Sequence, residues 1–154
     1  MLYTGFRHDG PAAVRYPRGR GPGVEIQKKM SAIPLGKSRT LRQGGDLAIL
    51  AFGSMVEPCV RVAEQLDASL IDMRFIKPMD RAAILAAAAH HSQLVTVEEN
   101  AIAGGAGSGV NEILAQEGLT ANILNIGLDD SYIQHGTRQE CLHQAGLDSE
   151  GILA

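Results

Sequence analysis

The sequence predicts an α/β fold, a doubly wound and mostly parallel sheet with helices on both faces. From residue 46 onward, short apolar runs alternate with amphipathic stretches. The runs are nearly continuous in apolar residues, which is typical of strands that are buried on both faces. Stretches of helical length separate these runs, so βαβ crossovers and parallel pairing are expected.

The strands and the helix starts can be placed from local signals. Strands are predicted at residues 46–53, 69–76, 94–97 and 122–127. Ser54 and Glu57 have the spacing of a capping box, which indicates a helix after the first strand. Asp80 is expected to cap the helix after the second strand. Thr137 and Glu140 repeat the capping-box spacing before the last predicted helix.

Glycine and proline mark where elements end. A helix over 110–117 is expected to stop at Gly118, and the last helix is expected to reach about Ala145, with Gly146 behind it. The stretch from Gly19 to about Lys29 has the composition of a linker. The following segment, "IPLGKSRTLRQGGD", could supply a short antiparallel edge strand before the first parallel one.

Composition narrows the classes of function. The chain has 154 residues, 45% hydrophobic and 20% charged, which is expected of a folded globular chain. A net charge of −3, aromatic residues at 4% and no basic stripe disfavour nucleic-acid binding. No apolar run is long enough to cross a bilayer and no secretory signal is evident, so a cytoplasmic protein is predicted. Cys59 and Cys141 are expected to be free thiols.

The most conspicuous loop is "GGAGSG", residues 104–109. It follows a predicted strand and opens a helix, a position where backbone N–H groups can cradle an anion. Its glycines match neither G-x-G-x-x-G nor a P-loop. A tight turn, with Glu98 and Glu99 as local hydrogen-bond partners, is the simpler interpretation. The alternative is a stand-alone Rossmann-like module that uses Gly104 to Gly109 for an anion, a nucleotide or an interaction.

Catalytic and metal sites are not predicted from the other polar residues. Glu98 and Glu99 are adjacent on a strand end and point to opposite sides, so they do not form an acid/base pair. Two histidines close a helix, where a cation suits the dipole. Cys141 and His143 face different directions on a helix, which disfavours a shared metal.

The segment "RYPRG" at residues 15–19 is the better candidate for a binding site. An extended stretch before Pro17 would place Arg18 at the carboxyl end of a strand, the edge where α/β folds bind ligands. A guanidinium held there can grip a phosphate in bidentate fashion. The other interpretation is a surface arginine paired with a carboxylate, and spacing alone does not decide between them.

Several long motifs resemble one enzyme family. "DGPAAVRYPRG", "DMRFIKPMD", "VTVEENAIAGGAGSGVNE" and "LNIGLDDSYIQHGT" are similar to the carboxyl-terminal part of 1-deoxy-D-xylulose-5-phosphate synthases, which are transketolase-like and depend on thiamine diphosphate. The resemblance runs from the first residue to the last few. It implies that residues 1–22 are the end of a pyrimidine-binding domain plus the start of a linker. Residues 23–154 would then form a transketolase-like C-terminal domain.

The resemblance also implies a function. The whole enzyme would condense pyruvate with glyceraldehyde 3-phosphate, releasing CO₂, for isoprenoid precursor, thiamine and pyridoxol biosynthesis. It would use thiamine diphosphate and Mg²⁺, whose binding motifs are expected outside this sequence, and would form a homodimer. Arg18 would bind the substrate phosphate, with Arg15 as a possible helper. The isolated chain would be inactive, with a structural and dimer-forming role.

Overall fold

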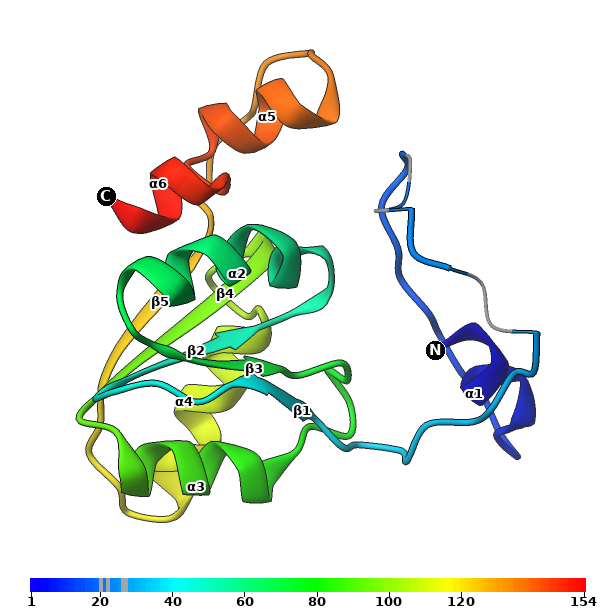
Figure 1. The fold of residues 1–154 in the computed structure, drawn as a ribbon, viewed down its shortest axis with the longest axis horizontal. Helices are drawn as coiled ribbons and strands as arrows, with labels where there is room; N and C mark the ends of the chain where they lie inside the picture. Colours follow the sequence, from blue (N-terminus) through cyan, green and yellow to red (C-terminus); the bar gives the residue numbers. More distant parts are fainter. Residues whose placement is uncertain (20, 22, 26–27) are drawn as a thin grey trace.

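The computed structural model describes residues 1–19, 21, 23–25 and 28–154, and it shows one five-stranded sheet flanked by helices (Figure 1). The strands are β1 (Arg39–Arg42), β2 (Leu47–Ala51), β3 (Ser69–Asp72), β4 (Gln93–Ala101) and β5 (Asn122–Leu128). Their order across the sheet is β1-β3-β2-β4-β5. β2 to β5 are parallel, and β1 is antiparallel to β3 at one edge, as the sequence predicts.

Helices cover both faces of this sheet (Figure 1). The helical elements are α1 (Leu2–Arg7), the 3₁₀ turn η1 (Gly53–Met55), α2 (Val56–Gln65), α3 (Arg81–His90), α4 (Ala106–Gln116), α5 (Arg138–Gln144) and α6 (Ser149–Leu153). α2 and α6 pack in a hydrophobic cluster on one face, whereas α3 and α4 pack in a second cluster on the other. The predicted doubly wound fold is therefore confirmed.

The central strand β2 shows why its sequence is apolar throughout. Ala48 and Leu50 point into the α3–α4 cluster, and Ile49 and Ala51 point into the α2–α6 cluster. All four side chains are buried. Because neighbouring residues on a strand face opposite ways, a strand that is covered on both sides needs apolar residues at every position.

Two of the three predicted helix caps are confirmed. The Asp80 carboxylate accepts from Ala83 N at the start of α3, and Thr137 and Glu140 form a complete capping box on α5. The capping box predicted for Ser54 and Glu57 is wrong. A 3₁₀ turn comes first, α2 begins after it without a side-chain cap, and the Ser54 hydroxyl donates to a carboxylate on β4 instead.

Other boundaries differ from the prediction. β4 runs four residues past Val97, to Ala101, and α4 begins inside the glycine motif at Ala106. β3 ends at Asp72 rather than at residue 76, and the short helix α6 follows α5, which was predicted to be the last. The loop between β4 and α4 is shorter than predicted because its glycines permit a close approach, as shown below.

The described residues among the first 34 form an arm beside the sheet domain (Figure 1). α1 is joined to the chain that leads into β1 by a hydrogen bond from Ile33 N to Thr4 Oγ1 at 3.0 Å. Residues 11–17 are extended but belong to no strand, so the strand expected at residues 12–16 does not form within the described part of the chain. No described helix is long and apolar enough to cross a bilayer.

Candidate functional site

The glycine loop binds a carboxylate of the chain itself. Glu98 is 4% exposed, and its side chain turns under the start of α4. Its carboxylate oxygens accept from Ala106 N and Gly107 N, both at 2.7 Å. The N–H groups that would hold an external anion at this helix start are therefore already occupied. The anion-site alternative for Gly104 to Gly109 loses these binding groups. The interpretation as a turn with a local carboxylate partner is confirmed for Glu98, whereas Glu99 bonds Ser54 and Arg138 instead.

Two glycines of the motif are required by these contacts. A Cβ atom at Gly105 would lie within 2.6 Å of both Glu98 carboxylate oxygens. A Cβ atom at Gly107 would lie 2.6 Å from Thr96 Oγ1 and 2.7 Å from Asn125 Nδ2, which are themselves hydrogen-bonded across β4 and β5. The glycines thus allow the carboxylate and the two strands to approach α4 closely.

The strand order identifies another position for a site. The chain leaves β2 for α2 on one face of the sheet, and it leaves β4 for α4 on the opposite face. β2 and β4 are neighbours, so their carboxyl ends flank a topological switch point. In open α/β sheets, ligands bind in the crevice at this point.

Four residues meet at this switch point, and we refer to them as the Glu99 cluster: Arg15, Ser54, Glu99 and Arg138. Ser54 Oγ and Arg138 Nη2 donate to the same Glu99 oxygen, Oε2, at 2.6 and 2.5 Å. Arg15 Nη2 donates to the backbone carbonyl oxygen of Glu99 at 3.2 Å. The cluster thus joins the arm, the turn after β2, the end of β4 and the start of α5.

Glu99 is ionised in this setting. Burial by itself would raise the pKa of the Glu99 carboxyl, but the hydrogen bonds from Arg138 and Ser54 and the charges of Arg138 and Arg15 outweigh it. The pKa therefore lies below its ordinary value. Glu99 is thus a fixed anion between two guanidinium groups.

Arg18, the predicted phosphate ligand, lies on the arm next to this cluster. Its side chain is exposed, three residues after Arg15. On its other side, a Cβ atom at Gly19 would lie 4.0 Å from Arg138 Cδ, so the chain passes Arg138 directly after Arg18. The structure therefore brings the predicted residue and its predicted helper to the switch point. The phosphate-binding role itself stays a prediction.

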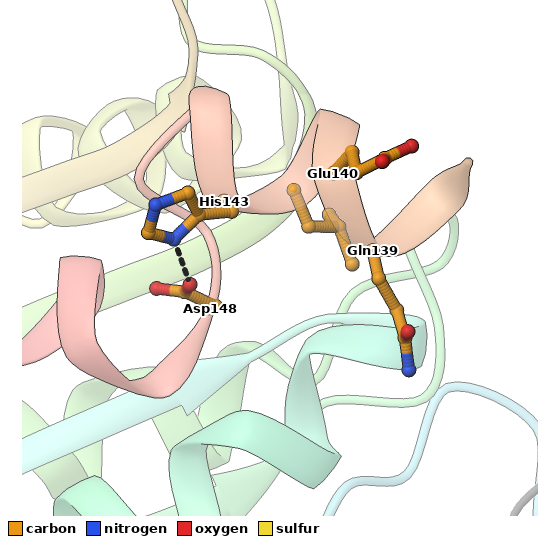
Figure 2. A pocket seen from close by; sticks show the side chains of 5 residues that line it. Gln139, Glu140, His143 and Asp148 are labelled. Atoms are coloured by element: carbon orange, nitrogen blue, oxygen red, sulfur yellow. Dashed lines mark hydrogen bonds and ion pairs between the residues drawn. The ribbon is translucent and has the colours of Figure 1, made fainter. Parts of the chain in front are cut away.

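Several other titratable residues have structural partners. His143 Nδ1 and Asp148 Oδ2 lie 2.6 Å apart and join α5 to α6 beside an open pocket of about 400 Å³ (Figure 2). His91 bridges Ala87 O and Ser69 Oγ, both at 2.9 Å. Both cysteines are free thiols, as predicted, and burial raises the pKa of Cys59 to about 12. Among the residues that the structure describes, no three His, Cys, Asp or Glu side chains cluster as metal ligands.

Sequence reasoning missed most of the Glu99 cluster. Ser54 lies just after β2 and Glu99 near the end of β4, so a prediction of the strand order would have placed them at one crevice. Arg138 had no such signal, because its approach to β4 depends on the irregular segment before α5. Only the arginines of the arm were singled out.

Comparison with known proteins identifies the domain. A family model described as the C-terminal domain of transketolase matches residues 36–152. The chain belongs to this family. The transketolase C-terminal domain thus comprises the sheet and its helices, whereas the arm lies before the matched range.

Curated relatives match almost the whole chain. They include 1-deoxy-D-xylulose-5-phosphate synthases from Alcanivorax borkumensis (55% identical over 152 residues), Chromohalobacter salexigens (54% over 154) and Methylococcus capsulatus (55% over 152). The matches cover 99% of this chain but only 24% of each relative. The chain therefore spans about a quarter of their length and is similar to their carboxyl-terminal part.

Solved structures show the same transketolase architecture. A split-gene transketolase, described as an inactive beta4 tetramer (four beta subunits, not the strand β4), is 27% identical to this chain. The two superpose with a TM-score of 0.74, and the match covers 90% of this chain and 44% of the transketolase chain. Transketolase from Campylobacter jejuni superposes with a TM-score of 0.54 over 77% of this chain and 18% of its own. At 14% identity, the second supports the fold alone.

Proposed function

We propose that this chain is the carboxyl-terminal part of a 1-deoxy-D-xylulose-5-phosphate synthase. The observation that carries the proposal is the 50–55% identity to curated synthases over nearly all of the chain, arm included. The reaction is the condensation of pyruvate with glyceraldehyde 3-phosphate with release of CO₂. Its product would feed the synthesis of isoprenoid precursors, thiamine and pyridoxol.

Arg18 is the residue of this chain assigned to the substrate. A guanidinium can grip the phosphate of glyceraldehyde 3-phosphate in bidentate fashion, away from the reacting carbon. Binding at this remote group orients the aldehyde and so contributes to the rate. The position of Arg18 between Arg15 and Gly19, which contact Glu99 and Arg138 at the switch point, supports this role. Arg15 acts as a helper through its bond to Glu99.

The cofactor of the synthase would be thiamine diphosphate with Mg²⁺, which supplies an electron sink for the decarboxylation when it is bound. The residues of this chain do not fit that group. Within the described ranges, the Asp, Glu, His and Cys side chains do not gather in threes, and the anion site at α4 is filled by Glu98. We therefore assign cofactor binding to parts of the synthase outside this sequence.

The chain alone would be inactive, and the synthase would be a cytoplasmic homodimer. The split-gene transketolase neighbour is described as an inactive tetramer, which supports the inactivity of the isolated chain and its self-association. In the proposed division, residues 1–22 end the pyrimidine-binding domain and begin the linker, and residues 23–154 form the C-terminal domain. Exposed apolar side chains on the arm, at Leu2, Phe6 and Tyr16, are consistent with burial against the rest of such a synthase.

The test uses the synthase that carries this sequence. Arg18→Gln is expected to raise KM for glyceraldehyde 3-phosphate about tenfold or more, because a charged hydrogen-bonded pair is lost, while KM for pyruvate changes little. Arg61→Gln, at an exposed arginine on α2, is the control. Equal increases in KM for glyceraldehyde 3-phosphate and for pyruvate would contradict the assignment of Arg18 to the phosphate. Turnover by the isolated chain, with cofactor and both substrates, would contradict its proposed inactivity.

A further inference from the structure

The loop that carries Arg18 is attached to the domain on both sides. Before it, Arg15 Nη2 donates to the Glu99 carbonyl oxygen at 3.2 Å. After it, the backbone at Gly19 passes the Arg138 side chain. Tyr16, Pro17 and Arg18 therefore lie between a contact with the Glu99 backbone and a contact with Arg138, and the side chains of Glu99 and Arg138 form an ion pair.

Glu99 is held in place independently of the arm. Its Oε2 atom accepts from Ser54 and from Arg138, which come from opposite sides of the switch point. The Glu99 side chain is 29% exposed and that of Arg138 is 33% exposed, so water screens this pair only in part. The carboxylate is thus a fixed negative charge before Arg15 approaches.

The charge balance explains why an acid is needed at residue 99. Arg15 and Arg138 both approach this residue, and Arg18 follows on the same short loop. The carboxylate offsets one of the two positive charges that approach it, and without it Arg15 and Arg138 would repel each other more strongly. The exposed Arg18 guanidinium has no hydrogen-bond or ion-pair partner among the residues that the structure describes.

We propose that Glu99 is a positioning residue: with Arg138 and Ser54, it fixes the loop at Arg15 and so presents Arg18 to the substrate phosphate. This inference rests on the proposed function for the role of Arg18. The loop attachment itself does not depend on that role. The two parts are therefore tested by different measurements.

The attachment is tested on the chain alone by amide hydrogen exchange of residues 13–19. Arg15→Met removes the donor, and Glu99→Gln removes the charge while keeping a side chain that Ser54 and Arg138 can contact. Each is expected to speed exchange in this loop about two- to fivefold, the range for one partly exposed interaction between charged groups. Arg15→Lys is expected to restore part of the protection.

Glu64→Gln, an exposed acid on α2, should leave exchange unchanged. Unchanged exchange in Arg15→Met and Glu99→Gln would overturn the attachment.

The positioning role is tested in the synthase that carries this sequence. Glu99→Gln and Arg15→Met are expected to raise KM for glyceraldehyde 3-phosphate about two- to fivefold, with KM for pyruvate and kcat little changed. Faster loop exchange with no change in this KM, while Arg18→Gln still raises it, would overturn the positioning role alone. No effect of Arg18→Gln would instead overturn the proposed phosphate role.

Discussion

At the scale of single residues, the start of α4 shows how a buried acid can define a loop. Glu98 accepts from two N–H groups at the positive end of the helix dipole, so its charge is compensated although it is buried. Gly105 leaves the space for it. The glycine motif is therefore explained by a contact within the chain rather than by a ligand.

A substitution at Gly105 tests this explanation. Gly105→Ala would place a methyl group against both Glu98 oxygens and the Ala101 carbonyl, so it is expected to lower the free energy of unfolding by about 1–3 kcal/mol. Urea denaturation followed by circular dichroism measures the change. Gly21→Ala is the matched control, because a Cβ atom there meets nothing within 4 Å. Equal stability of the two variants would show that the close contact is not needed.

At the scale of elements, an imidazole–carboxylate pair joins the last two helices, α5 and α6. His143 belongs to α5, and Asp148 caps α6 by accepting from Gly151 N at 2.8 Å (Figure 2). The hydrogen bond that His143 donates to Asp148, with smaller contributions from the charges of Asp148 and Glu150, raises the pKa of His143 above its ordinary value. The hydrogen bond from Gly151 N, followed by that from His143, lowers the pKa of Asp148.

These pKa shifts predict how stability depends on pH. The raised pKa of His143 means that its contribution is fully present below about pH 6.5 and is lost as the pH rises through the folded-state value. The contribution of Asp148 is present above about pH 4 and is lost only as the pH falls through its lowered value. His143→Gln is therefore expected to lower Tm at pH 6 more than at pH 9. His135→Gln, at an exposed histidine, is the control, and a constant difference across pH would contradict the pair's role.

Element prediction succeeded where local chemistry decides the structure. The four parallel strands and the caps at Asp80 and Thr137 follow from apolar runs and side-chain hydrogen bonds within a few residues. The cap at Ser54 failed because a tertiary partner, Glu99, competes for the same hydroxyl group. Short α6 was missed because its stability depends on burying Ile152 next to α2, which no local pattern reports.

At the scale of the whole molecule, the arm and the sheet domain differ in how they are held. The domain has two hydrophobic clusters, one on each face of the sheet. The arm exposes Phe6 and Tyr16 and is joined to the domain through the Arg15–Glu99 bond. Residues 36–154 are therefore expected to fold without the arm.

Removal of the arm tests this division. A chain of residues 36–154 is expected to unfold cooperatively with a Tm within about 4 °C of that of the full chain, since about 1 kcal/mol corresponds to 2–4 °C at this size. Differential scanning calorimetry of both chains provides the comparison, and Leu147→Ala in the shorter chain is a control. Leu147 is fully buried, so that change is expected to lower stability by about 2–5 kcal/mol. A Tm loss without the arm as large as that of Leu147→Ala would show that the arm is part of the core.

The candidate site was only partly predictable because it is assembled from distant segments. Arg15 and Arg18 could be singled out from the short "RYPRG" segment. The residue that accepts from Arg15, Glu99, lies 84 residues further along the chain and was interpreted from local sequence alone. Its partner Arg138 reaches β4 through tertiary packing. Sequence spacing does not predict which of these distant residues are in contact until the strand order is known.

The shared oxygen of Glu99 also bears on how this sequence can diverge. Ser54 and Arg138 donate to that one atom from separate stretches of chain, so a replacement at any of the three changes what the other two tolerate. Related sequences are therefore expected to exchange these residues jointly, with loss of the acid accompanied by loss of the base. Such correlated substitutions would reveal the ion pair in an alignment of relatives even where each of these positions varies.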